Sequence, residues 1–165
     1  MGERALLDAV IAFPAMHVGV RTAGDALAEI VYLSLEAPLR PPRNALAERA
    51  ARQLERYRAD PDYAFDLPLA RSGTPFQQHV WRAIGAIPRG RVRSYGALAR
   101  ELRSAARAVG QACGSNPLPL IIPCHRVVAA RGLGGFAHHA AGFHVEVKRW
   151  LLEHEGCPVA HAPAS

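Results

Sequence analysis

Three side chains that can take part in chemistry follow one another at Cys124, His125 and Arg126, between an apolar run ending in a proline and two valines. A free cysteine has a pKa of about 8.5 and becomes a nucleophile at neutral pH only when a neighbour favours its thiolate. Adjacent residues of an extended chain point to opposite sides, so His125 can act on the thiol only across a sharp bend or a bridging water. A third group should orient the imidazole, and Glu153 and Glu155 are candidates.

The same residues have simpler interpretations. A lone cysteine is most often a small hydrophobic residue of the core, and the histidine beside it can be a buried structural side chain. A hydrolytic Cys–His pair usually takes its histidine from a distant part of the chain, so that interpretation is weaker. A zinc site is weaker again, because four further histidines have no recognised ligand spacing with the cysteines. These are His138, His139, His144 and His154. The stretch alone supports a nucleophilic and a structural Cys124 about equally.

The composition is that of a globular protein in a reducing compartment. Half of the 165 residues are hydrophobic, which is enough for a substantial core. The three cysteines, Cys113, Cys124 and Cys157, are an odd number at no disulfide-framework spacing, which indicates free thiols. The sequence shows no secretory signal and no apolar stretch long enough to cross a bilayer. We therefore expect a cytoplasmic protein.

Positive charge is concentrated in the second part of the chain. Residues 1–70 carry eight arginines and ten acidic residues, a net charge of −2, whereas residues 71–165 carry a net charge of +8. Seven arginines and one acidic residue lie between Arg82 and Arg107. Because arginine binds phosphate groups in a bidentate manner, this pattern favours contact with a polyanion over a merely solvated surface.

The first third of the sequence predicts strands and one helix. Strand patterns lie at residues 9–13, 16–22, 26–35 and 65–70. A proline-rich connector then leads to a helix that Asn44 can cap and that extends to residue 60. We place a domain boundary at Arg71, so that residues 1–71 form a small α/β scaffold domain with a short antiparallel sheet.

The remaining sequence predicts mostly helices. Helical patterns lie at residues 74–87, 94–102, 105–116 and 145–156, with a short buried strand at 120–122. Thr74 and Ser94 can cap the first two helices, and Pro75 suits a first helical position. Two short helices joined by a brief turn in a basic context form a helix-turn-helix pattern. We therefore predict an α+β protein, with a DNA-binding domain at 72–157 and a disordered tail at 158–165.

The second helix of this pair consists largely of small residues. They are Ala105, Ala106, Ala108, Gly110, Ala112 and Gly114. Close packing inside a core explains such a helix, and so does close approach to a DNA minor groove, which is only about 6 Å wide. Arg107 is then a long cationic side chain on a surface of small residues.

Three stretches carry a resemblance to a known family. IPRGRVRSYGALA, ARAVGQACGSNPLPLII and PCHRVV resemble the motifs of the O6-alkylguanine-DNA alkyltransferases, over about residues 72–156. In that family a small N-terminal domain lies beside a mostly helical domain that holds the helix-turn-helix and the active site. The resemblance therefore implies the same α+β fold.

The resemblance assigns chemical roles by motif. In the family, a cysteine accepts the alkyl group after losing its proton through a water held by a histidine, which a glutamate orients. These roles fall on Cys124, His125 and Glu155. Tyr95 resembles the tyrosine that helps to swing the nucleotide out and hydrogen-bonds the guanine. Arg107 resembles the arginine that enters the minor groove and replaces the flipped-out base.

The resemblance also implies contacts with DNA and with the alkyl group. The other residues expected to contact DNA are Arg89, Arg91, Arg93, Ser94 and Ala106. Asn116 is expected to brace the turn before the active-site strand, while Pro119, Phe136 and Ala137 are expected to line the substrate pocket. Arg126 is expected to be structural.

The implied activity is DNA repair by direct transfer. One alkyl group would move from O6-alkylguanine, or O4-alkylthymine, to the cysteine of a methylated-DNA–[protein]-cysteine S-methyltransferase that works once. The resemblance implies no cofactor and no metal. The expected partner is double-stranded DNA bound through its minor groove by a monomer that makes no membrane contact.

A different class of protein has a similar helix pair. A helix-turn-helix regulator with a structural or redox-sensing cysteine would also be basic in this region. Such a regulator usually needs a surface for dimerisation, and no pattern in this sequence indicates one. The presence of Cys124 also argues against the alkyltransferase-like proteins that bind lesions without repairing them.

Overall fold

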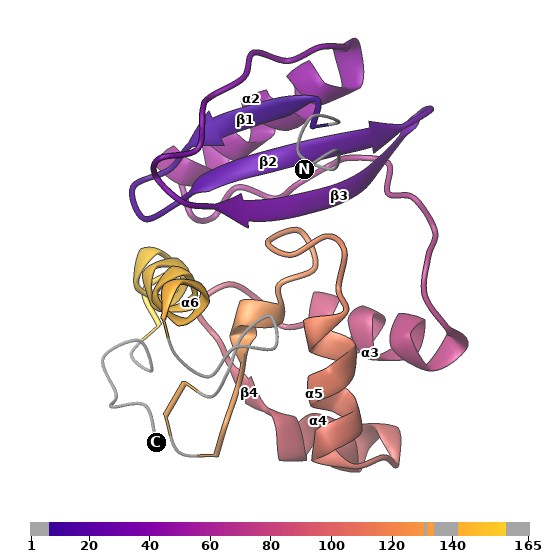
Figure 1. Cartoon of the computed structure of the whole chain (residues 1–165). Coiled ribbons are helices and arrows are strands. Elements are labelled where there is room, and N and C mark those ends of the chain that lie inside the picture. Colours follow the sequence, from indigo (N-terminus) through magenta and orange to yellow (C-terminus); the bar gives the residue numbers. More distant parts are fainter. Residues whose placement is uncertain (1–6, 131, 134–141, 158–165) are drawn as a thin grey trace. The chain divides into compact units, whose positions relative to one another are not determined.

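The computed structural model describes residues 7–130, 132–133 and 142–157 (Figure 1). The chain divides into two compact units, Met1–Arg71 and Ser72–Ser165. The predicted tail at 158–165 lies outside the described residues. In the described part, no helix has both the length and the apolar character needed to cross a membrane.

The N-terminal unit is an antiparallel sheet covered on one face by a helix (Figure 1). Its elements are β1 (Ala9–Ala12), β2 (His17–Ala23), β3 (Ala26–Leu33) and α2 (Ala45–Ala59). The strands follow the order β1-β2-β3, and α2 packs on all three. Asn44 caps α2 by accepting a hydrogen bond from the Ala47 N–H at 2.8 Å, as predicted. The predicted strand at 65–70 is reduced to one bridge, between Leu69 and Leu27.

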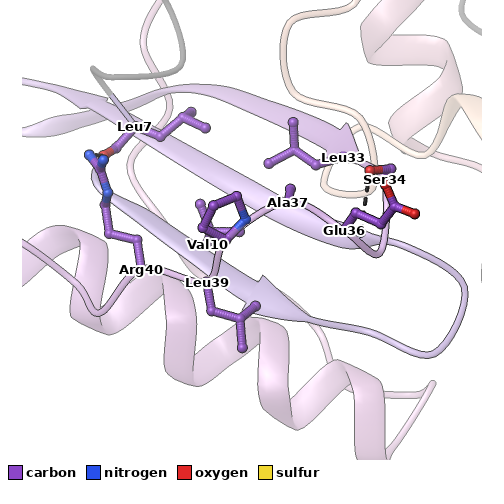
Figure 2. Close-up of a pocket in the computed structure, with 9 residues that line it drawn as sticks. Leu7, Val10, Leu33, Ser34, Glu36, Ala37, Leu39 and Arg40 are labelled. Atoms are coloured by element: carbon purple, nitrogen blue, oxygen red, sulfur yellow. Dashed lines mark hydrogen bonds between the residues drawn. The ribbon is translucent and has the colours of Figure 1, made fainter.

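An apolar hollow of about 400 Å³ opens on this N-terminal unit (Figure 2). Its floor is a small cluster of Leu7, Val10 and Leu33, and the connector after β3 forms its rim. The Arg40 guanidinium ties the rim to the start of β1 by donating to the Leu7 carbonyl at 2.8 Å. Among the described residues, none that the sequence predicts for the site lines this hollow. All residues that the sequence predicts for the site belong to the C-terminal unit.

The C-terminal unit is mostly helical. Its elements are α3 (Pro75–Gly85), β4 (Arg93–Ser94), α4 (Tyr95–Leu102), α5 (Ala106–Gly114), β5 (Val127–Val128) and α6 (Phe143–His154). Thr74 and Gln77 form a reciprocal capping box at the start of α3, and Ser94 caps α4 through the Ala97 N–H. These caps are the ones that the sequence predicts. The buried residues of α3 are Val80, Trp81 and Ile84, whereas Phe76 in its first turn is 38% exposed.

The helix-turn-helix consists of α4, a tight turn and α5 (Figure 1). Arg103 ends α4 in the left-handed conformation, with φ of 55°, and the Ser104 N–H donates to the Ala99 carbonyl at 2.8 Å. α3 supports the pair, because the Trp81 indole N–H donates to the Ala112 carbonyl at 2.8 Å. The predicted α+β class, with a short antiparallel sheet and a helix-turn-helix, is confirmed.

A second predicted strand, at 120–122, is also wrong. Residues 120–122 do not form a strand but a turn, in which Leu120 has a φ of 78° and the Ile122 N–H donates to the Leu118 carbonyl at 2.9 Å. Prolines on both sides remove the N–H groups that a strand would use. The short parallel pairing in this unit joins β4 to β5, with Arg93 opposite Val127.

Candidate active site

Cys124 begins a single 3₁₀ turn, Cys124–Arg126, that leads into β5. Its N–H donates to the Ile122 carbonyl at 2.7 Å, and the Arg126 N–H donates to the Pro123 carbonyl at 2.9 Å. Only 2% of Cys124 is exposed. The turn is the sharp bend that frees the cysteine and histidine side chains from the strict alternation of a strand.

Asn116 lies against the sulfur of Cys124. Its side-chain amide donates to Cys124 Sγ at 3.1 Å and to the Ile122 carbonyl at 2.9 Å. Its Oδ1 accepts from the Leu118 N–H at 2.9 Å, so one side chain closes the loop that leads to the thiol. A hydrogen bond donated to sulfur favours the thiolate and lowers the pKa of the thiol.

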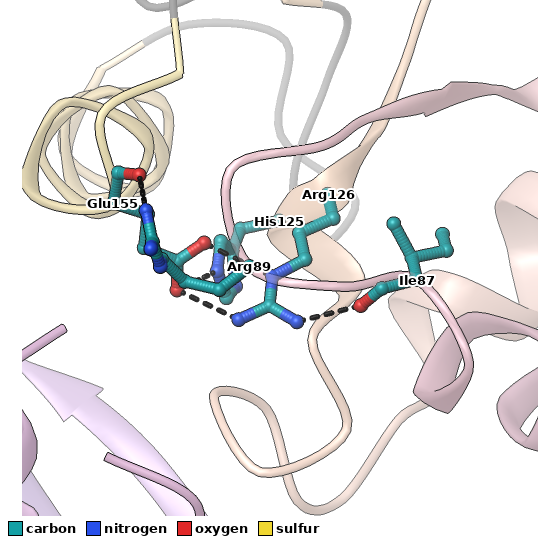
Figure 3. Close-up of polar contacts among 5 residues, drawn as sticks. All are labelled: Ile87, Arg89, His125, Arg126 and Glu155. Atoms are coloured by element: carbon teal, nitrogen blue, oxygen red, sulfur yellow. Dashed lines mark hydrogen bonds and ion pairs between the residues drawn. The ribbon is translucent and has the colours of Figure 1, made fainter. Parts of the chain in front are cut away.

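A buried carboxylate holds His125 and Arg126 together (Figure 3). Glu155, which follows α6 and is 1% exposed, lies with Oε2 2.9 Å from His125 Nε2. Arg126 binds the same carboxylate with both Nε, at 3.0 Å, and Nη2, at 3.1 Å. The third nitrogen of Arg126 donates to the Ile87 carbonyl at 2.7 Å, and Arg89 donates to the Glu155 carbonyl at 2.9 Å. The geometry selects Glu155 over Glu153, which is exposed.

The charges of this network fix the state of the imidazole. Burial alone would raise the pKa of Glu155, but His125 and Arg126 together hold that pKa well below its ordinary value. Burial lowers the pKa of His125, against the opposing pull of Glu155. A neutral imidazole facing a carboxylate carries its proton on Nε2. His125 Nδ1 is buried without a hydrogen-bond partner among the described residues and carries the lone pair, as a base requires.

A second buried ion lies close to the thiol. Lys148 of α6 is fully buried, and its Nζ donates to the Val127 carbonyl at 2.8 Å and to the Leu133 carbonyl at 2.7 Å. Burial lowers the pKa of Lys148 to about 8, while two neighbouring cysteines raise it. The positive charge in turn lowers the pKa of Cys124. This lysine was not predicted from the sequence, where its signal was a cation on the apolar side of a helix.

Tyr95 begins α4 with its ring between α5 and Lys148. The Lys148 Nζ lies 5.8 Å from the ring centroid. A side chain at Gly110 would meet the ring of Tyr95 at 3.9 Å, so the small residues of α5 provide room for it. Burial raises the pKa of the Tyr95 phenol, and the cysteines Cys113 and Cys124 raise it further. The phenol is therefore a neutral hydrogen-bond donor at physiological pH.

The surroundings of Cys124 favour its protonated thiol. A hydrogen bond with the Cys113 side chain raises the pKa of Cys124 most, followed by burial and the charge of Cys113. Asn116 and Lys148 lower it, but the pKa stays well above its ordinary value. The proton must therefore leave during the reaction, which requires a base such as His125.

The residues predicted to contact DNA differ in their exposure and in the contacts that they already make within the protein. Arg91 and Arg107 are exposed, and their side chains make no ion pair with the described residues. Arg93 forms an ion pair with Glu101. Arg89 donates a hydrogen bond to the carbonyl of Glu155, directly after α6. Ala106 is the exposed first residue of α5, and Ser94 is the helix cap of α4.

Part of the predicted substrate pocket lies outside the described residues, namely Phe136 and Ala137. Pro119 is half-buried and forms an isolated bridge with Ile122. Among the residues that the structure describes, no cluster of three or more His, Cys, Asp or Glu side chains could hold a metal ion.

Comparison with known proteins gives consistent similarities. A family profile described as "6-O-methylguanine DNA methyltransferase, DNA binding domain" matches residues 75–157. Methylated-DNA–protein-cysteine methyltransferase of Shigella flexneri is 50% identical over 92 residues, which cover 54% of this chain and 52% of the relative. The protein of the same name from Methanosarcina mazei is 36% identical over 143 residues, covering 81% of this chain and 87% of the relative. The match thus spans about half the length of the Shigella protein.

Solved structures extend the similarity to the whole fold. The crystal structure of Mycobacterium tuberculosis O6-methylguanine methyltransferase has a TM-score of 0.73 and 38% identity, covering 94% of each chain. The structure of M. tuberculosis OGT in complex with DNA has a TM-score of 0.72 and 36% identity, covering 92% of this chain and 94% of that one.

Proposed function

Because the chain belongs to the 6-O-methylguanine DNA methyltransferase family, we propose that it repairs DNA by transferring an alkyl group from O6 of guanine to Cys124. The observation that carries this proposal is the buried His125, which lies in the same turn as the buried thiol and is paired with the buried Glu155. Glu155 fixes the imidazole tautomer, and Nδ1 is left as the basic nitrogen. A merely structural cysteine would need no such base.

The reaction begins with loss of the thiol proton. His125 accepts it at Nδ1, across a bridging water as the family resemblance implies, and Glu155 stabilises the imidazolium that forms. Lys148 and Asn116 stabilise the developing thiolate. Both groups are already in place, so they need little reorganisation during the reaction.

The thiolate then attacks the alkyl carbon. A C–S bond forms as the bond from that carbon to guanine O6 breaks, and its electron pair stays on the guanine. Tyr95, a neutral phenol, donates a hydrogen bond to the leaving base. The product is a thioether, and among the described residues we find no group placed to cleave it, so each molecule reacts once.

DNA approaches the helix-turn-helix as a duplex, through its minor groove. The lesion lies inside the stack, so the nucleotide must be extruded at a cost of a few kcal/mol in lost stacking. Arg107 fills the space left in the duplex, and Ala106 permits close approach. Arg91 supplies a phosphate contact. The protein acts as a monomer, and O4-alkylthymine is a second substrate.

Transfer of label tests the proposed chemistry. We expect a duplex oligonucleotide with O6-methylguanine labelled in the methyl group to pass one label per protein molecule to Cys124, located by peptide mass analysis. Cys124→Ser should bind the same DNA and take up no label, while Cys157→Ala, the matched control, should react normally. Turnover beyond one equivalent, or label on another cysteine, would refute the proposal.

A pair of substrates tests the role of Arg107. Free O6-benzylguanine needs no extrusion, so Arg107→Ala should slow repair of a duplex lesion much more than reaction with the free base. Arg82→Ala, which removes an exposed arginine of α3, is the control and should affect both substrates little. Equal losses on both substrates in Arg107→Ala would rule out a role in extrusion.

A further inference from the structure

The basic loop between α3 and β4, residues 87–92, contacts the glutamate that orients the base. The Ile87 carbonyl accepts a hydrogen bond from Arg126 Nη1 at 2.7 Å, and Arg126 also binds the Glu155 carboxylate. Arg89 Nη1 donates to the main-chain carbonyl of Glu155 at 2.9 Å (Figure 3). The loop therefore reaches Glu155 at two points, through Arg126 at the carboxylate and through Arg89 at the main chain.

Two glycines provide independent geometric evidence for this contact. Gly90 has a φ of 84°, and a side chain at this position would meet the Glu155 carbonyl oxygen at 3.5 Å. Gly156 has a φ of 76°, and a side chain there would meet Arg89 Nη1 at 4.0 Å. Both backbone conformations are left-handed, and glycine adopts them at little cost. The loop and the chain after α6 therefore lie close together around the hydrogen bond from Arg89 to Glu155.

The carbonyl that Arg89 binds needs a partner from outside the helix. α6 ends at His154, and the last carbonyl groups of a helix have no acceptor role within it. The Glu155 N–H still donates to the Leu151 carbonyl at 3.0 Å, but the Glu155 carbonyl lies beyond the end of α6. This end also carries the negative pole of the helix dipole, which a guanidinium complements. Arg89 thus fixes the main chain of the residue whose side chain orients His125.

We propose that Arg89 is a positioning residue for the transfer reaction, which acts through Glu155 and His125 and not through DNA. The inference rests on the proposed function. It differs from the expectation raised by the sequence, in which Arg89 contacts DNA. Arg91 of the same loop is exposed and takes the phosphate contact.

A small displacement of Glu155 is enough to slow the transfer. Catalytic groups must be held within about 0.5 Å of the productive geometry. When Arg89 is lost, Arg126 still holds the carboxylate through two hydrogen bonds, at 3.0 and 3.1 Å. We therefore expect Arg89→Ala to slow transfer by about 10-fold, which is less than the roughly 10²-fold that a misplacement of about 1 Å can cost.

Separate measurements of rate and affinity test the proposal. Single-turnover rates are measured at saturating duplex O6-methylguanine and with free O6-benzylguanine, and the Kd for undamaged duplex is measured at several salt concentrations. Arg89→Ala should lose about 10-fold in rate on both substrates, with the Kd and its salt dependence unchanged. Arg91→Ala should instead weaken the Kd and reduce the salt slope by about 0.9. Arg82→Ala, an exposed arginine of α3, is the control and should change neither quantity.

Two outcomes of these measurements would overturn the proposal. An unchanged rate in Arg89→Ala would leave this residue a structural role only, and a weaker Kd with a normal rate on the free base would make it a DNA contact. Arg89→Lys, which keeps a cationic donor for the carbonyl, should recover most of the rate. The final number of alkyl groups accepted per Arg89→Ala molecule should equal that of the wild type, so that unfolded protein does not explain a slower reaction.

A measurement without DNA separates this inference from the proposed function. The His125 Nε2 proton, held by the buried Glu155, should give an NMR signal that exchanges slowly with water in the wild type. Exchange should be faster in Arg89→Ala and unchanged in Arg82→Ala. Equal protection in Arg89→Ala would overturn the positioning role. Absence of transfer in the wild type would overturn the proposed function, and the exchange comparison would still decide whether Arg89 positions the Glu155–His125 pair.

Discussion

Replacing Glu155 by glutamine is the sharpest perturbation of the site. The carboxylate is 1% exposed and accepts hydrogen bonds from His125 and from two nitrogens of Arg126. Glutamine has nearly the same shape but no charge, a single acceptor oxygen and an amino group. With its oxygen at the position of Oε2, the Glu155→Gln side chain should keep the contacts with His125 Nε2 and Arg126 Nη2. Its amino group would then face Arg126 Nε, and the guanidinium would lose its counter-ion.

The expected loss of stability is large. A hydrogen bond to a charged group contributes about 1.5–3 kcal/mol, which is the expected cost of the one lost contact. Removing one partner of a buried ion pair typically costs about 3–5 kcal/mol, because the remaining charge is left unpaired. We therefore expect the free energy of unfolding to fall by about 3–5 kcal/mol. Alkyl transfer should slow by about 10²-fold or more, because the tautomer of the base is no longer fixed.

The loss should depend on pH in a defined direction. The pKa of Glu155 lies well below its ordinary value of 4.5 in the folded chain, so its stabilising contribution is complete above pH 4.5 and is lost as the pH falls below it. The pKa of His125 is also lowered from 6.5, so the folded chain of both proteins loses stability as the pH falls below 6.5. Because Glu155 raises the pKa of His125, its removal lowers that pKa further, so the difference between wild type and Glu155→Gln should not narrow until the pH falls below 4.5.

Urea unfolding at several pH values and single-turnover transfer rates measure these effects. Glu153→Gln is the matched control, since this residue is exposed on the same helix and its substitution should change stability by no more than about 0.5 kcal/mol. A Glu155→Gln protein with unchanged stability and a normal transfer rate would refute our account of the network. A stability difference that narrows between neutral pH and pH 4.5 would refute the assigned charge states.

Two further predictions concern side chains beside Cys124, and a third concerns the cap of α3. Lys148→Met removes a cation that lowers the pKa of Cys124, so the pH–rate profile for transfer should move to higher pH, and an unmoved profile would contradict this electrostatic role. Asn116→Ala removes hydrogen bonds to the sulfur and to a main-chain carbonyl, so both the transfer rate and, by about 1–3 kcal/mol, the free energy of unfolding should fall. Thr74→Ala removes the cap of α3 and should lower the free energy of unfolding by about 1 kcal/mol, whereas Ser72→Ala, just outside the helix, should leave it nearly unchanged in the same urea titration.

Local signals in the sequence were sufficient for the helix starts. The side chains of Asn44, Thr74 and Ser94 each accept a hydrogen bond from the N–H three residues later. Both partners of each interaction therefore lie within four consecutive residues. Alternation of apolar residues was likewise sufficient for the antiparallel sheet of the N-terminal unit. Local signals failed at residues 120–122, where an apolar run looked like a strand. There the prolines and the side chain of Asn116 impose a turn instead.

By itself, the sequence determined the candidate acceptor, its neighbouring histidine and the basic helix pair, because these are fixed by residue type and short spacing. Residue types alone left Glu153 and Glu155 both open as partners of the histidine, and the family resemblance assigned Glu155. Only the tertiary structure gives the physical reason, since Glu155 is 30 residues from His125 in sequence and is buried against it, whereas Glu153 is exposed. The burial of Lys148 was likewise visible only in the tertiary structure. Hydrogen bonds and charges gain their strength from a low-dielectric interior, and which side chains share that interior depends on how distant segments pack.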